Sequence, residues 1–137
     1  HRGIAYDIEI NKDGCLHPLY TNKKLKFNSP AFNFDEVIKI PNSATLLSSN
    51  ELNNVMGLNF KTKTSDIWGI QYHPEITYEK MISLIHFRKE RLLNKGAFKN
   101  TQEINTHITK INKELKKSEK ISRMKELENW LTYLYDN

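Results

Sequence analysis

His73 and Glu75 are separated by a single proline and follow the apolar segment Ile-Trp-Gly-Ile-Gln-Tyr at residues 67–72. In an extended backbone, residues i and i+2 point to the same side, so the imidazole and the carboxylate can meet. Pro74 disfavours helical geometry at His73 and restricts its own φ. A carboxylate beside an imidazole selects the tautomer and stabilises the imidazolium, which is the orienting half of a nucleophile–base–acid triad.

A structural interpretation of the same residues stays open. His-Pro-Glu tripeptides arise by chance, and a histidine at a strand end is more often a surface or packing residue than a catalyst. His17, His86 and His107 have no carboxylate or cysteine partner nearby in sequence, and we expect them to be surface or packing residues. No Cys/His cluster has the spacing of a zinc site, so the chain predicts no metal and no cofactor.

Up to residue 76 the sequence has the pattern of short strands separated by turns. Strand candidates lie at residues 4–10, 24–27, 36–40, 44–48, 54–61 and 67–72, with a turn at 11–14. The last candidate is apolar on both faces, which predicts a central strand buried on both sides. Catalytic sites of open α/β sheets lie beyond the carboxyl ends of strands, where this strand would place His73 and Glu75.

After residue 76 the apolar residues follow helical spacing. Thr77 is the expected N-cap of a first helix, and Gly96 lies in the expected C-cap region. Apolar stripes at residues 104–115 and 124–134 predict two further helices that pack together and are joined near residues 117–118. We expect three aromatic residues to dock the last helix on the core: Trp130, Tyr133 and Tyr135.

The composition is that of one globular domain, with 38% hydrophobic and 27% charged residues in 137. No apolar run approaches the roughly 18–20 residues needed to cross a bilayer, and residues 1–4 lack the features of a signal peptide. We therefore expect no membrane association and a cytoplasmic location. The chain does not begin with methionine, and a fragment of a longer protein is one interpretation.

The net charge of +5 comes entirely from residues 77–137, which hold thirteen Lys/Arg and eight Asp/Glu. A solvated helical face is the favoured interpretation, because glutamates interrupt the lysines and no aromatic or arginine-rich base-reading pattern accompanies them. A nucleic-acid surface is the less favoured alternative. The lysines of this tail are Lys110, Lys113, Lys116, Lys117 and Lys120.

The segment Trp-Gly-Ile-Gln-Tyr-His-Pro-Glu at residues 68–75 resembles the closing catalytic segment of class I glutamine amidotransferases. The runs at residues 35–37, 40–41, 44–50 and 54–58 are similar to the family's usual sequence ahead of that segment. Residues 3–5, 13–14, 17–20 and 126–131 resemble the GMP synthase-like subgroup. The resemblance implies an α/β fold: the C-terminal part of a three-layer, flavodoxin-like amidotransferase domain over residues 1–96, with a helical C-terminal extension over 97–137.

In this family the histidine is the base paired with a cysteine, and the glutamate holds the histidine; the resemblance assigns these roles to His73 and Glu75. It assigns glutamine binding to Asn33, Phe34 and Asp35. The family commonly has histidine where this chain has Asn33. Its cysteine occupies a Gly-x-Cys-x-Gly turn that this chain lacks. Cys15 fits no such turn, and we interpret it as an ordinary, partly buried thiol.

The implied activity is hydrolysis of glutamine to glutamate and ammonia, with a cysteine upstream of this chain. The implied partner is a synthetase, as a domain or a separate chain, that takes up the ammonia. This chain alone is expected to be inactive. A second class of function is a non-catalytic remnant or binding subunit that keeps the fold. A third, nucleic-acid association through the basic tail, is the least favoured.

Overall fold

Five strands form one curled sheet in the computed structural model, which describes residues 1–136. Their order across the sheet is β2–β1–β3–β4–β5, and every neighbouring pair runs antiparallel. The strands are β1 (Arg2–Ile10), β2 (Lys26–Phe32), β3 (Thr45–Ser49), β4 (Gly57–Lys61) and β5 (Asp66–Ile70). This mixed α/β arrangement is compatible with part of an α/β domain, and the three-layer organisation stays a prediction.

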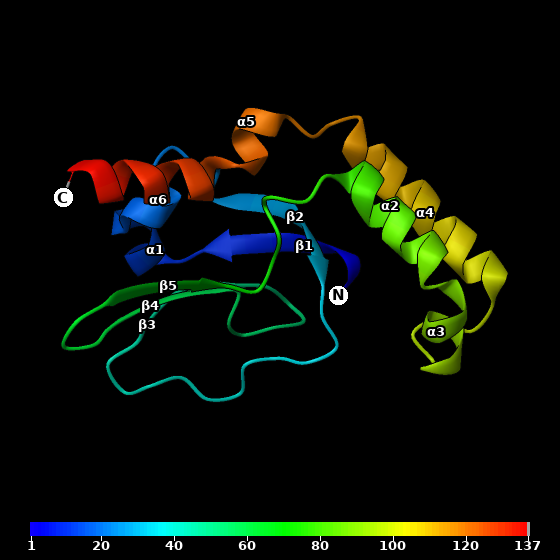
Figure 1. Cartoon of the computed structure of the whole chain (residues 1–137), viewed down its shortest axis with the longest axis horizontal. Coiled ribbons are helices and arrows are strands. Elements are labelled where there is room, and N and C mark those ends of the chain that lie inside the picture. Colours follow the sequence, from blue (N-terminus) through cyan, green and yellow to red (C-terminus); the bar gives the residue numbers. More distant parts are fainter. Residues whose placement is uncertain (137) are drawn as a thin grey trace.

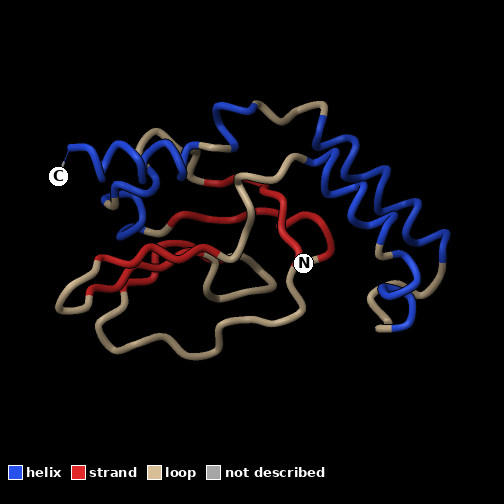
Figure 2. Tube along the Cα trace, in the orientation of Figure 1, coloured by secondary structure: helices blue, strands red, loops and turns tan. Residues whose placement is uncertain are grey.

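Two local predictions in the first half are wrong. Residues 36–40 are not a strand but part of the long connection between β2 and β3 (Figure 2). The turn predicted at residues 11–14 is instead the start of helix α1 (Lys12–Leu16), capped by Asn11, whose side chain accepts a hydrogen bond from Gly14 N at 2.8 Å. A Cβ at Gly14 would lie only 2.2 Å from the Leu47 carbonyl oxygen, so this close helix–strand contact requires glycine.

The prediction of a central strand at residues 67–72 is also wrong. Within the described part of the chain β5 pairs only with β4 and forms the edge of the sheet, and Ile67 is 36% exposed. Side chains, rather than a further strand, cover its aromatic residue. The Trp68 ring has the rings of His17 and Tyr133 at centroid distances of 4.8 Å.

Helix α2 (Tyr78–Phe87) begins where the sequence predicts. The Thr77 hydroxyl accepts a hydrogen bond from Lys80 N at 3.1 Å, which confirms Thr77 as the N-cap. Met81 and Ile85 of the predicted stripe are fully buried. The helix ends at Arg88, and a short helix α3 (Lys89–Asn94) precedes Gly96, whose φ of +67° suits a helix terminus.

The last helices do not pack on each other. Helix α4 (Thr101–Leu115) packs on α2, whereas α6 (Lys125–Asp136) packs on the 3-10 helix η1 (Pro18–Tyr20) at the opposite end of the molecule (Figure 1). Helix α5 (Lys120–Arg123) belongs to the connection between them. The prediction of two packed terminal helices is therefore wrong, because the stripe of α4 faces α2. None of the helices within residues 1–136 is long and apolar enough to cross a membrane.

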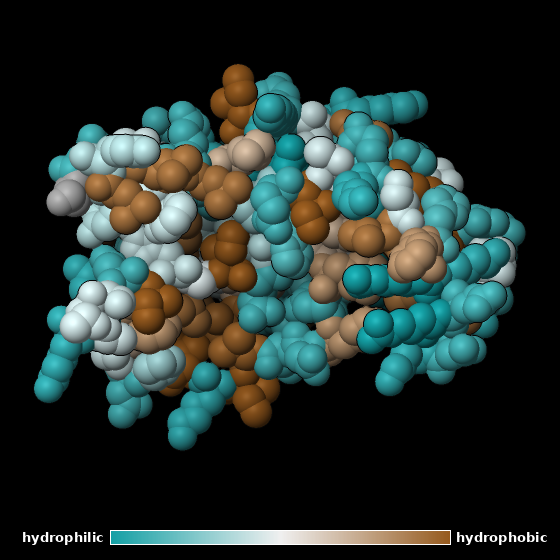
Figure 3. Space-filling view, in the orientation of Figure 1, coloured by the Kyte–Doolittle hydropathy of each residue, from teal (hydrophilic) through white to brown (hydrophobic). Residues whose placement is uncertain are grey.

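Helix α6 is anchored mainly by polar contacts. Leu131 and Leu134 are 48% and 52% exposed, and apolar side chains gather at this end of the molecule (Figure 3). The predicted aromatic docking holds for Tyr133, which packs on Trp68, but Trp130 and Tyr135 are exposed.

Strand β1 contributes to two separate cores because it contains a β-bulge. Asp7 has φ +49°, the register shifts between Ala5 and Ile8, and Asn28 Oδ1 accepts a hydrogen bond from Asp7 N at 2.8 Å. One core, under α2 and α4, contains Ile4, Tyr78, Ile85, Leu92, Phe98, Ile104, Ile108 and Ile111. The other contains Ala5, Ile8, Leu19, Tyr20, Ala31, Leu47, Met56 and Tyr72.

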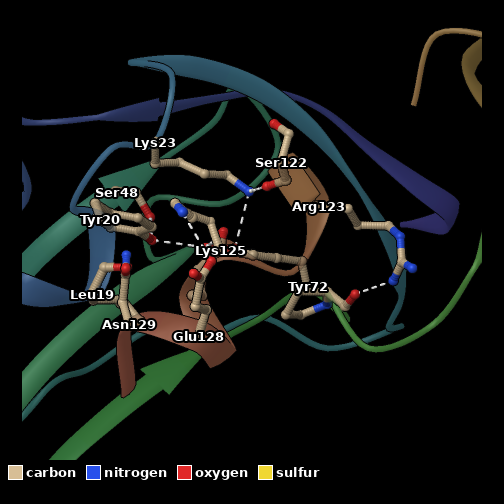
Figure 4. A network of polar contacts seen from close by, with 12 residues as sticks. Leu19, Tyr20, Lys23, Ser48, Tyr72, Ser122, Arg123, Lys125, Glu128 and Asn129 are labelled. Carbon is tan, nitrogen blue, oxygen red and sulfur yellow. Dashed lines mark hydrogen bonds and ion pairs between the residues drawn. The ribbon is translucent and has the colours of Figure 1, made fainter. Parts of the chain in front are cut away.

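The second core contains a buried carboxylate. Glu126 of α6 is 1% exposed, and its two oxygens lie 3.0 Å from Lys23 Nζ and 2.8 Å from the Tyr72 hydroxyl. Lys23 Nζ also donates to the Ser122 carbonyl at 2.8 Å (Figure 4). The Lys23 side chain is 3% exposed, so this is a fully buried ion pair. Asn129 adds 2.9 Å hydrogen bonds to the carbonyls of Leu19 and Thr21.

Three hydroxyls extend this cluster into the sheet. The Tyr20 hydroxyl lies 3.0 Å from that of Tyr72 and 2.7 Å from Ser48 Oγ. A phenol has one proton to donate, and a carboxylate is the stronger acceptor, so Tyr72 donates to Glu126 and Tyr20 donates to Tyr72. Burial raises the pKa of Tyr20 to about 12 and raises that of Tyr72 well above its ordinary value.

Removing the buried carboxylate should destabilise the fold strongly. Glu126→Ala leaves the Lys23 ammonium buried without its counter-ion, and we expect the free energy of unfolding to fall by about 3–5 kcal/mol in denaturant titrations. Glu128→Ala is the matched control on the same helix, because Glu128 pairs with Lys125 at the surface. The control should cost less than about 1 kcal/mol. Equal costs for the two variants would contradict the role of the buried pair.

The buried tyrosines predict a loss of stability at alkaline pH. Tyrosine ionises near about 10 in the unfolded chain, whereas the pKa of folded Tyr20 is raised to about 12. Above that lower pKa the unfolded state binds fewer protons, so the free energy of unfolding falls as pH rises. Burial lowers the pKa of Lys23 and has the opposite sign, but only below its ordinary value of 10.5.

Between pH 10.5 and 12 the tyrosines therefore dominate within this cluster. We expect Tyr20 to contribute a loss of about 2–3 kcal/mol by pH 12, measured by denaturant titration across the alkaline range. Tyr20→Phe should have a shallower pH dependence than the wild type. An unchanged slope in that variant would show that Tyr20 is not protonated preferentially in the folded state.

Candidate functional site

The structure brings His73 and Glu75 together as their spacing predicts. His73 Nδ1 lies 2.8 Å from Glu75 Oε1. The two side chains are 44% and 51% exposed, so the pair is half in solvent. A carboxylate can only accept, so neutral His73 carries its proton on Nδ1 and presents Nε2 as an acceptor. This is the geometry of a general base whose orientation is set by a carboxylate.

Backbone hydrogen bonds hold the pair where β5 leaves the sheet. Gln71 N donates to the Met56 carbonyl at 2.9 Å, and His73 N donates to the Pro30 carbonyl of β2 at 2.7 Å. Ile76 N then donates to the His73 carbonyl at 3.1 Å, which forms a tight turn before α2. His73 is therefore tied to two strands on one side and to the start of a helix on the other.

Arg123 is a contact of this turn that sequence reasoning missed. Its Nη1 donates to the Pro74 carbonyl and, at 3.2 Å, to the Ile76 carbonyl. These two carbonyls flank Glu75. An arginine so far along the chain from Glu75 gives no sequence signal of such a contact, because a basic residue in a basic tail is expected to face solvent.

Cys15 does not lie near the pair. His73 N is bonded to Pro30, which pairs with Ile4 near the start of β1, and Cys15 lies in α1 beyond the far end of that strand. The strand from Ile4 to Ile10 measures roughly 15–20 Å at the usual rise per residue. The interpretation of Cys15 as partly buried is wrong, because its side chain is exposed.

A pocket of about 680 Å³ lies between the loop after β2 and the end of α2. The predicted glutamine-binding residues Asn33, Phe34 and Asp35 line it, but His73 and Glu75 do not. The remaining lining residues are Phe32, Glu36, Val37, Gln71, Arg88, Arg91 and Leu92. The structure thus groups the predicted binding residues with each other and with two arginines that the sequence did not single out.

Asn33 connects this pocket to the segment that leads to His73. Its Nδ2 donates to the Gln71 side-chain oxygen at 3.3 Å and to the Asp35 carbonyl at 2.9 Å. The amino terminus of His1 donates to the Asn33 carbonyl at 2.8 Å, and burial lowers the pKa of that amino group. Asn33 therefore occupies a structural corner of the loop.

The pocket carries charges of both signs. The Arg88 guanidinium lies over the Phe32 ring at 5.4 Å, and neither Arg88 nor Arg91 forms an ion pair with another described residue. Asp35 and Glu36 supply two carboxylates. Such a surface can take a zwitterionic small molecule. Among residues 1–136 no group of three or more His, Cys, Asp or Glu side chains is arranged to hold a metal ion.

Comparison with known proteins places this chain beside two hydrolases, although no family model matches it. It is 25% identical over 101 residues to a gamma-glutamyl-L-1-hydroxyisopropylamide hydrolase of a Pseudomonas species, a region covering 74% of this chain and 34% of that protein. It is 35% identical over 60 residues to a glutamine-hydrolyzing GMP synthase subunit of Methanocaldococcus jannaschii, covering 44% and 31%. The chain thus matches about a third of the length of each relative. The similarities support a relationship to hydrolases of the glutamine amidotransferase type.

Proposed function

We propose that this chain supplies the base half of a glutamine-hydrolysing site, with His73 as the general base and acid and Glu75 as its orienting carboxylate. The observation that carries the proposal is the 2.8 Å contact between His73 Nδ1 and Glu75 Oε1, which leaves Nε2 facing away from Glu75. The names of both relatives describe hydrolysis of a γ-glutamyl amide, since glutamine is itself such an amide. In the proposal, residues 1–96 are the amidotransferase part and residues 97–137 its helical extension, of which Asn137 lies outside the described residues.

The nucleophile comes from outside this chain. His73 Nε2 removes the proton from a cysteine thiol, and the thiolate attacks the glutamine side-chain amide carbon. The same imidazole then gives the proton to the departing ammonia, which leaves a thioester. Water, activated by His73, attacks the thioester to release glutamate and the thiol. Glu75 remains ionised and holds the imidazole in one orientation throughout.

The substrate side of the proposal uses the loop after β2. Asn33, Phe34 and Asp35 line the pocket, and Asn33 is hydrogen-bonded to Gln71, two residues before His73. We assign the glutamine backbone to this side of the site, with Asp35 facing the ammonium group. A synthetase, as a domain or a separate chain, is the proposed acceptor of the ammonia, by analogy with the GMP synthase to which the chain is similar.

A second candidate is a non-catalytic subunit that keeps the fold. The position of Cys15 favours it for the isolated chain, because this only cysteine lies beyond the far end of β1 from His73. The two candidates differ in the gene: an encoded Gly-x-Cys-x-Gly turn upstream of residue 1 supports the enzyme. Glutamate production by the protein as its gene encodes it then separates them.

Replacing the base should abolish hydrolysis. In the protein as encoded, we expect His73→Ala to lower kcat for glutamate release by about 10²–10⁴-fold, because no other group of the site can accept the thiol proton. Glutamate is measured by a coupled dehydrogenase assay. His86→Ala, an exposed histidine on α2, is the matched control and should retain wild-type turnover. Wild-type turnover in the His73 variant would refute the assignment.

Neutralising the carboxylate of the binding loop should weaken substrate binding. If Asp35 faces the glutamine ammonium, Asp35→Asn raises KM by about tenfold with kcat little changed, because the contact is the same in the ground state and the transition state. The matched control is Glu51→Gln, an exposed carboxylate outside the pocket. A fall in kcat at constant KM would place Asp35 in the chemistry rather than in binding.

A further inference from the structure

The contact between His73 and Glu75 lacks support on the side of the glutamate. Among the described residues, the Glu75 side chain has His73 as its single hydrogen-bonding partner, and it is half exposed. The ladder of β5 ends at Ile70, and α2 does not begin until Tyr78. Pro74 has no N–H to donate. Something other than the sheet or the helix has to fix the backbone on either side of Glu75.

Arg123 contacts both sides of that residue. Its Nη1 donates to the carbonyls of Pro74 and Ile76, which immediately precede and follow Glu75. Two carbonyls held by one cationic nitrogen restrict the peptide planes between them, and hydrogen bonds from a charged donor are roughly twice as strong as neutral ones. The direction in which the Glu75 side chain leaves the backbone depends on those planes.

The buried ion pair fixes the position of Arg123 in turn. Lys23 Nζ donates to the carbonyl of Ser122, the residue before Arg123, and pairs with Glu126, three residues after it. Figure 4 shows Lys23 meeting Ser122 while Arg123 extends in the opposite direction. Glu126 also accepts from Tyr72, the residue before His73. The same helical segment thus holds residues 72, 74 and 76.

We propose that Arg123 is a positioning residue for the His73–Glu75 pair, acting through the Pro74 and Ile76 carbonyls, and that the C-terminal helical segment is part of the hydrolytic site. This role deepens the glutamine hydrolysis proposed above and rests on it for its catalytic meaning. The contact itself belongs to this chain, so it can be tested without any nucleophile.

The direct test measures the tautomer of His73. Long-range ¹⁵N–¹H NMR spectra of the 137-residue chain, recorded where histidines are neutral, report the ratio of Nδ1–H to Nε2–H forms. The wild type should be mostly Nδ1–H. In Arg123→Ala the carboxylate is released, and we expect that ratio to fall by about fivefold, the effect of one lost hydrogen bond. Arg123→Lys, which keeps a cationic donor, should recover most of the wild-type ratio.

Lys120→Ala is the matched control, because Lys120 lies exposed on the same short helix and should leave the ratio unchanged. A folded Arg123→Ala protein with the wild-type ratio overturns the proposal. If that variant does not fold, Arg123→Gln replaces it, since the amide can still reach one carbonyl. A wild-type ratio in the Gln variant likewise overturns the proposal, and an intermediate ratio supports it.

Turnover separates this inference from the proposed function. In the protein as encoded, Arg123→Ala should lower kcat by about tenfold with KM little changed, because only the alignment of the base is affected. A shifted tautomer ratio in a protein with no glutaminase activity would sustain the positioning role and refute the hydrolysis. Full activity in a variant whose ratio is also unchanged would refute the positioning role and leave the hydrolysis standing.

Discussion

The buried pair of Lys23 and Glu126 is the constraint on which both ends of the structure depend. A carboxylate in a protein interior is tolerated only when its charge is compensated and its oxygens are bonded, and here an ammonium and a phenol provide both. The helix that carries Glu126 leaves several of its large apolar residues exposed. Its attachment therefore depends on polar contacts, and it has one register, set by one charge.

The candidate site inherits its geometry from that attachment. His73 is bonded to β2 through its own amide, whereas Glu75 lies on a turn whose carbonyls are held from the other end of the chain. A base and its orienting acid thus reach each other through two independent supports. Such a division is common where catalytic residues lie on loops and a rigid scaffold places them. The pair is adjacent in sequence, but its rigidity comes from non-local contacts.

Local signals in the sequence predicted local structure well. The i, i+2 spacing of His73 and Glu75 and the capping by Thr77 involve a few neighbouring residues, and both appear as predicted. The apolar faces of residues 67–72 predicted burial but not what would cover them, and side chains of α6 and the His17 ring do so instead of another strand. Glu126 and Arg123 resemble surface residues in a charged tail, because hydropathy describes a residue and not its partners.

The bulge at Asp7 has a consequence for how the chain tolerates changes in length. Side chains of a regular strand alternate between faces, so Ile4 and Ile8 would share one face, yet they belong to different cores. The extra residue reverses the alternation halfway along β1. Deletion of one residue there would turn Ile8 away from its core while every residue before it kept its place. Insertions and deletions in this strand are therefore restricted by parity rather than by size, and a substitution at Asp7 is more easily accommodated than its loss.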